Sequence, residues 1–263
     1  MDGDRAKKSS LLRRVIPNEH ARMTVLALFV GVAAGYGAVG FRYLINFFQS
    51  IANGSSANLR EIARALPRYQ RIWVPPAGGL LVGPLVYYFA REAKGHGVPE
   101  VMDAVALKGG LIRKRLVVVK TLASSLCIGS GGSVGREGPI VQIGSAIGSA
   151  IGQLLKTSPD RMRTLVGCGA AAGIAATFNA PIAGAMFALE IILGDFAIAT
   201  FSPIVISAVT ATAISRHYLG DFPAFIVPGY ELVSAWEFPL YVTLGGLCAV
   251  VAVVFVRVLY RTE

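Results

Sequence analysis

Two glycine-rich segments, each followed by a proline and an apolar run, carry the residues whose spacing points to chemistry. They are Gly95-His-Gly-Val-Pro-Glu100 and Gly135-Arg-Glu-Gly-Pro139. Proline is well tolerated in the first turn of a helix, because the N–H groups of that turn have no partner inside the helix. Glycine lets the backbone approach a ligand closely. Both segments therefore predict helix N-termini with accessible N–H groups.

Two helix N-termini aimed at one point would bind an anion without a formal positive charge, because each presents N–H groups and the positive end of the helix dipole. Partial charges hold an anion weakly enough to release it, as permeation requires. A phosphate loop is disfavoured, since no Gly-Lys-Ser/Thr follows and no βαβ pattern surrounds the segments. The candidate anion-binding residues are Gly95, His96, Gly97, Val98, Pro99, Gly135, Arg136, Glu137, Gly138 and Pro139.

The elements around these segments are apolar enough for a membrane: 54% of the 263 residues are hydrophobic and 15% are charged. Uncharged stretches lie at 72–90, 164–189, 196–215 and 238–256, and a bilayer span needs roughly 20 residues. The predicted fold class is an all-α integral membrane protein with several spans. The helices at 23–50 and 73–91 are expected to form an antiparallel pair.

Some predicted helices are too short to span a bilayer. An apolar run at 116–128 stops at Gly129-Ser-Gly-Gly-Ser133 and restarts after Pro139, and a helix at 159–177 is interrupted at 178–181. Broken helices at membrane depth are tolerated only where protein or an aqueous cavity satisfies the free backbone groups. This pattern is typical of transporters. A ridge of Gly144, Gly148 and Gly152 predicts close helix packing.

The net charge of +10 is read as a topology signal, because the basic residues lie between apolar spans and no basic face is interleaved with aromatic residues. Nucleic acid is therefore not expected as a partner. Lys and Arg are concentrated in 1–22, 91–116 and 156–163, which places the N-terminus in the cytoplasm of a multi-pass cell-membrane protein. We expect neither an enzyme nor a metal or cofactor, because no His, Cys or carboxylate cluster has catalytic or metal spacing.

The segment at 135–139 resembles the G-[KR]-E-G-P signature of the CLC chloride channel and chloride/proton antiporter family. The segment at 95–100 is similar to that family's G-S-G-I-P-E signature, and 170–181 resembles a third family segment. The resemblance implies a bundle of long tilted and broken transmembrane helices, one of two inverted repeats. On this basis 1–22 is a basic cytoplasmic N-terminus, 23–218 is the first repeat, and 219–263 is an extracellular loop with the first helix of a second repeat that is otherwise missing.

The resemblance implies that Glu137 is a gate whose carboxylate competes with chloride and swings away when protonated. An ionisable residue within the membrane is functional by default, although a carboxylate that only caps the helix is the alternative. His96 departs from the family pattern, which has serine there. Imidazole could contact the anion or face the cytoplasm.

The resemblance also places Lys120 on a helix that flanks the pore, where it would raise the positive potential; snorkelling or an ion pair is the alternative. Glu190 is a candidate proton relay, although the family's exchangers often carry a second glutamate where this chain has Ile191. A voltage- or pH-gated chloride channel is therefore favoured over a chloride/proton antiporter. A non-conducting half-protein that needs a partner chain is a third reading, and the resemblance implies a homodimer.

Overall fold

The computed structural model describes residues 19–54, 67–89, 97–221, 229, 232 and 234–262, and all regular structure in these ranges is helical. The candidate residues Gly95 and His96 lie outside the described residues. In chain order the helices are α2 (Glu19–Asn53), α4 (Arg68–Phe89), α5 (Val98–Leu107), α6 (Arg115–Gly129), α7 (Glu137–Leu154), α8 (Pro159–Phe178), α9 (Pro181–Phe187), the π-helix η2 (Ala188–Leu193), α10 (Ile198–Leu219) and α11 (Glu237–Thr262).

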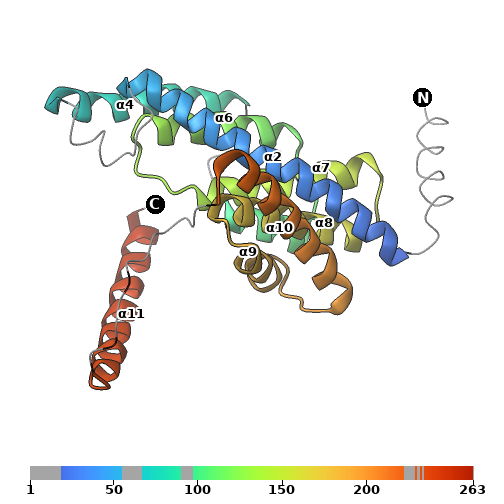
Figure 1. Ribbon diagram of the computed structural model, residues 1–263. Coiled ribbons are helices and arrows are strands. Elements are labelled where there is room, and N and C mark those ends of the chain that lie inside the picture. Colours follow the sequence, from blue (N-terminus) through green and yellow to red (C-terminus); the bar gives the residue numbers. More distant parts are fainter. Residues whose placement is uncertain are drawn as a thin grey trace. The chain divides into compact units, whose positions relative to one another are not determined.

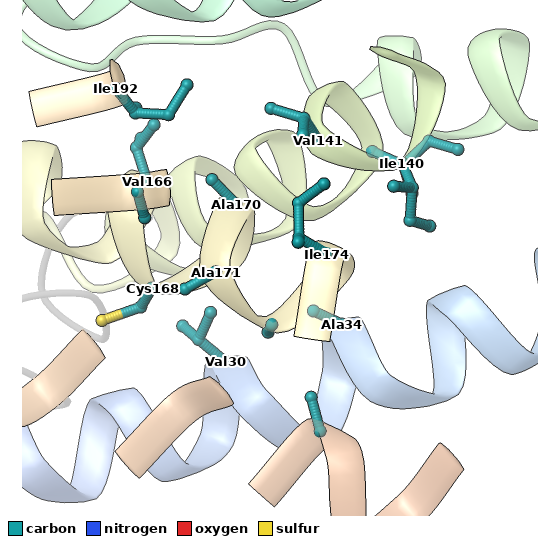
Figure 2. Packing of buried hydrophobic residues seen from close by; sticks show 14 of the residues in the cluster. Val30, Ala34, Ile140, Val141, Val166, Cys168, Ala170, Ala171, Ile174 and Ile192 are labelled. Carbon is teal, nitrogen blue, oxygen red and sulfur yellow. The ribbon is translucent and has the colours of Figure 1, made fainter. Parts of the chain in front are cut away.

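Helix α8 is the centre of the first compact unit, which ends at Ala224. It packs against α7, α10, α2, α9 and η2 (Figure 1). Figure 2 shows Ala170 and Ile174 of α8 near Val141 of α7, and Ala171 near Val30 of α2. These side chains are buried. The small residues of α8 let three neighbouring helices approach one axis, which keeps α7 in a fixed position.

Glycines set the distance between α7 and α8. A β-carbon on Gly144 would overlap the carbonyl oxygen of Gly169, and one on Gly169 would overlap that of Gly144. A β-carbon on Gly148 would overlap the carbonyl oxygen of Leu165. The predicted close packing along this ridge is confirmed, because the two backbones touch where side chains would otherwise keep them apart.

Serine hydroxyls add hydrogen bonds between the packed helices. Ser207 of α10 donates to the carbonyl oxygen of Cys168 at 3.0 Å, and Ser215 donates to that of Ala176 at 2.6 Å. Each satisfies a polar group inside the apolar core, which a membrane protein must do internally.

The predicted break after α8 is confirmed. Asn179 adopts a left-handed conformation with φ of 56°, which ends α8, and Pro181 begins α9. The side chain of Asn179 accepts a hydrogen bond from Arg216 Nε at 2.6 Å and donates one to Asp221 at 2.8 Å. This network connects the break to the C-terminal end of α10.

Four of the described helices are long and apolar enough to cross a membrane, namely α2, α4, α10 and α11. The second compact unit, Phe225–Glu263, contains α11, none of whose described side chains is buried. An apolar helix with an exposed surface suits lipid or protein contacts.

One expectation about the long helices was wrong. The expected antiparallel pair of the first two long helices is not the main contact of either one: α4 packs against α6, while α2 packs against α10, α8, α6 and α7. Helix α10 begins at Ile198, where Asp195 accepts hydrogen bonds from Ala197 N and Thr200 Oγ1 and so stabilises the first turn.

The contact between α7 and α8 predicts that two Gly-to-Ala changes have very different effects on the stability of the protein. We expect Gly169→Ala to destabilise the protein by about 1 to 3 kcal/mol, because the new methyl group overpacks the contact with Gly144. The control is Gly40→Ala on α2, where a β-carbon meets no atom within 4 Å, and where alanine should stabilise by roughly 0.5 to 1 kcal/mol. Thermal unfolding of both variants is the measurement, and equal melting temperatures would contradict the predicted packing.

Candidate functional site

The first turns of α5 and α7 meet in space although about 40 residues of the sequence separate them. Gly97 precedes α5 and has φ of +89°, and a β-carbon there would lie 2.6 Å from the carbonyl oxygen of Gly138. Gly138 belongs to the first turn of α7. The structure therefore brings together Gly97 and Gly138, one from each glycine-rich segment, with Val98, Pro99 and Pro139 in the same two first turns.

Glu100 closes the N-terminus of α5. Its Oε2 accepts a hydrogen bond of 2.5 Å from the N–H of Gly97. This is the glutamate half of a capping box, because Gly97 has no side chain to form the reciprocal bond. That N–H is consequently engaged, and Val98 supplies the next first-turn N–H, a group that a helix cannot satisfy internally. Glu100 was not predicted as a site residue, although a glutamate three residues after the residue that precedes a helix is a known signal for a helix N-terminus.

Lys120 lies on α6 and is buried, with 6% of its surface exposed. It interacts electrostatically with Glu100. The attraction between the ammonium group and the carboxylate opposes the cost of burying Lys120. The role of Lys120 beside a pore stays a prediction.

Glu137 is the first residue of α7 and is exposed to solvent. A β-carbon on Gly135 would overlap Oε2 of Glu137, so the carboxylate folds back over the backbone at Gly135. Any other residue at 135 would displace it. Arg136 is half-buried and interacts electrostatically with Arg42 of α2 and with Glu137. The arrangement leaves the Glu137 carboxylate at the start of α7 without burying it.

The loop between α6 and α7 contains the membrane break that the sequence predicted. Gly132 N donates to the carbonyl oxygen of Cys127 at 2.9 Å, and Ser130 Oγ donates to the same oxygen at 3.0 Å. Ser130 therefore stabilises the turn in this structure. The loop provides hydrogen bonds to carbonyl groups at the end of α6 and leads the chain into the first turn of α7.

Glu190 lies away from this meeting of first turns, on the π-helix η2. That helix contacts α5, α8, α9 and α10. Glu190 lines a pocket of about 620 Å³ together with Asp160, Arg163 and Asp195. Its neighbour Ile191 is 40% exposed. Among the described residues, no group of three or more His, Cys, Asp or Glu side chains could hold a metal ion.

A multi-helix membrane protein in which broken helices bring their N-termini to one point has the architecture of an ion channel or a secondary transporter. The chain belongs to the voltage-gated chloride channel family, CLC, whose family model matches residues 78–263. The family resemblance and the fold class expected from the sequence are both confirmed.

Relatives include channels and exchangers by name. The chain is 40% identical to a putative ClcB-like chloride channel protein of Ralstonia nicotianae, with 85% of this chain and 53% of that protein covered. It is 35% identical to the H(+)/Cl(-) exchange transporter ClcA of Vibrio vulnificus, with 88% and 50% covered. The crystal structure of a slow cyanobacterial Cl-/H+ antiporter matches with a TM-score of 0.70 and 27% identity, over 86% of this chain and 53% of that chain. The chain therefore spans about half the length of these relatives.

The contact between Gly97 and Gly138 predicts that alanine causes different losses of stability at two glycines whose backbones are both left-handed. Gly97→Ala should destabilise the protein more than Gly109→Ala, because only the first forces α5 away from α7. Both positions have positive φ and share a cost of roughly 1 to 2 kcal/mol for alanine, but a β-carbon on Gly109 comes no closer than 3.6 Å to another atom. Thermal unfolding measures the difference, and equal losses would argue against the contact.

Proposed function

We propose that this chain contributes to a chloride pathway across a membrane, with the anion held where the first turns of α5 and α7 meet. The observation that carries the proposal is the approach of Gly97 to Gly138, which brings two helix N-termini together. Their N–H groups and dipoles favour an anion and disfavour a cation. Relatives whose names include chloride channels and chloride/proton exchangers support chloride as the ion.

The charges around this point suit rapid release of the anion. Lys120 is offset by Glu100, so backbone dipoles supply most of the attraction. A full unpaired positive charge would hold chloride too tightly for conduction, whereas several weak interactions allow it to enter and leave. Transport of this kind needs no cofactor and no catalytic group.

We assign the gate to Glu137. Its carboxylate is tethered to the first turn of α7 and folds over Gly135, so it occupies the same positive field that attracts an anion. It is exposed and has room to move. Protonation removes its negative charge and with it the attraction to the helix end, which favours opening as the pH falls.

Passive conduction is favoured over proton exchange by one residue. Ile191, next to Glu190, cannot carry a proton, and the family resemblance associates exchange with a glutamate there. The family contains proteins named as exchangers, and Glu190 lines a pocket with other ionisable residues, so antiport with Glu190 as the relay is the second candidate.

The remaining assignments concern the whole protein. We place the N-terminus in the cytoplasm, assign 23–218 to the first of two inverted repeats and 219–263 to the loop and opening helix of the next, and expect a homodimer. Relatives about twice as long as this chain support the repeat assignment. Flux experiments therefore need the full-length protein, since this half alone would supply only part of the pore.

Glu137→Gln tests the gate. In the full-length protein in liposomes, we expect chloride flux of the wild type to rise as external pH falls, and flux of Glu137→Gln to be high and nearly independent of pH. Asp160→Asn is the matched control, because Asp160 is also a first-turn carboxylate, on α8, and its change should leave the pH profile intact. If Glu137 only caps its helix, its change would cost about 1 kcal/mol or less and retain the wild-type profile, which would remove it from the mechanism.

Simultaneous recording of chloride and proton movement tests coupling. We expect no proton movement to accompany chloride efflux from liposomes containing the full-length protein, because Ile191 provides no internal carboxylate. The Vibrio vulnificus exchange transporter ClcA serves as the positive control. A fixed chloride-to-proton ratio would overturn passive conduction, and its loss in Glu190→Gln would identify Glu190 as the relay.

A further inference from the structure

Gln142, in the second turn of α7, is a buried side chain whose polar atoms have no hydrogen-bond partner within the part of the chain that the structure describes. It is 1% exposed, and both Nε2 and Oε1 are unpaired. Ser149, on the same helix, accepts a hydrogen bond from Ile112 N and donates one to Gly110 O. A buried amide without partners costs about 1 to 3 kcal/mol. Gln142 therefore needs a hydrogen-bonding ligand.

Gln142 forms part of the wall of a pocket of about 440 Å³ between α5, the loop after it and α7. The same wall contains two carboxylates, Glu100 and Asp103, and two cationic side chains, Lys108 and Arg113. Empty cavities in proteins are apolar, whereas roomy polar cavities hold water. With both signs of charge on its wall, this pocket suits water better than a charged ligand of either sign.

The pocket extends along α5 from its exposed end toward its first turn. Lys108 forms an ion pair with Asp103 at the exposed end. Glu100 lies eight residues earlier, which is about 12 Å along a helix. Ala104 is midway, lines the pocket and is buried, with 4% exposed. Water in this pocket would therefore reach the residue that caps α5.

We propose that this pocket is a water-filled chamber that connects the surface at Lys108 with Glu100 and supplies the hydrogen bonds of Gln142. Both amide atoms of Gln142 are covered in the structure, so reaching this water requires its amide to rotate about the last side-chain torsion, which has broad preferences. The chamber gives Glu100, which lines it, a hydrated side. It thereby lowers the cost of placing this carboxylate next to the proposed anion site. The inference rests on the pocket and on Gln142, and it holds whether or not Glu137 is the gate.

Cysteine accessibility tests the chamber. In the full-length protein with Cys127 and Cys248 replaced by alanine, we expect Ala104→Cys to react with the neutral, water-soluble reagent hydroxyethyl methanethiosulfonate at least about tenfold faster than Ala171→Cys, because thiol reactivity depends on access. Ala171 is fully buried in the core of α8 and is the matched control, and Cys168, which is also buried, reports the background in both. Equal rates would overturn the proposal.

Gln142→Met gives an independent measurement, since methionine matches the length of glutamine and needs no hydrogen bonds. If water satisfies Gln142, this change removes favourable hydrogen bonds, and the melting temperature should equal or fall below that of the wild type. If the pocket is dry, the change relieves a buried unpaired amide, and the melting temperature should rise. A rise would overturn the proposal even if Ala104→Cys were reactive.

Discussion

The approach of two helix N-termini is the constraint on which the site depends. Gly97 and Gly138 bring the positive ends of α5 and α7 together, and two like partial charges repel each other unless negative charge is placed near them. The chain supplies a carboxylate to each helix. Glu100 accepts a hydrogen bond from the N–H of Gly97 and is attracted to Lys120, whereas Glu137 is exposed. In the proposed mechanism, this asymmetry lets one carboxylate maintain the site while the other exchanges with the anion.

The packing around α7 explains how these ends are held together against that repulsion. On one side, Gly144 and Gly148 bring α7 into backbone contact with α8. On another, Gln153 Nε2 donates to Ile112 O at 2.7 Å, and Ser149 bonds to the same loop, which follows α5. The contacts of α7 therefore hold its own N-terminus in place and also the loop that follows α5. A change at Gly144 or Gly148 would therefore alter the proposed anion site, even though these glycines lie in the core.

Much of this arrangement follows from the sequence because hydropathy and turn residues act locally. The breaks at Gly129 and Asn179 and the helix starts near Pro99 and Pro139 were predicted within a few residues. Partners between helices were harder to predict, since an apolar surface does not specify which neighbour covers it; hence the wrong partner for α4. The roles of Glu100 and Gln142 depend on side chains from different helices, and local patterns indicate neither the charge pair with Lys120 nor an unpaired amide.

The central claim is that an anion binds where α5 and α7 begin, and bromide in crystals of the full-length protein tests it most directly. Bromide is a chloride analogue that X-ray anomalous scattering locates without reference to any assumed site. The account predicts a bromide peak within hydrogen-bond distance of the Val98 N–H and next to the first turn of α7, strengthened in Glu137→Gln because the competing carboxylate is neutral. Bromide bound only elsewhere in both proteins would contradict it.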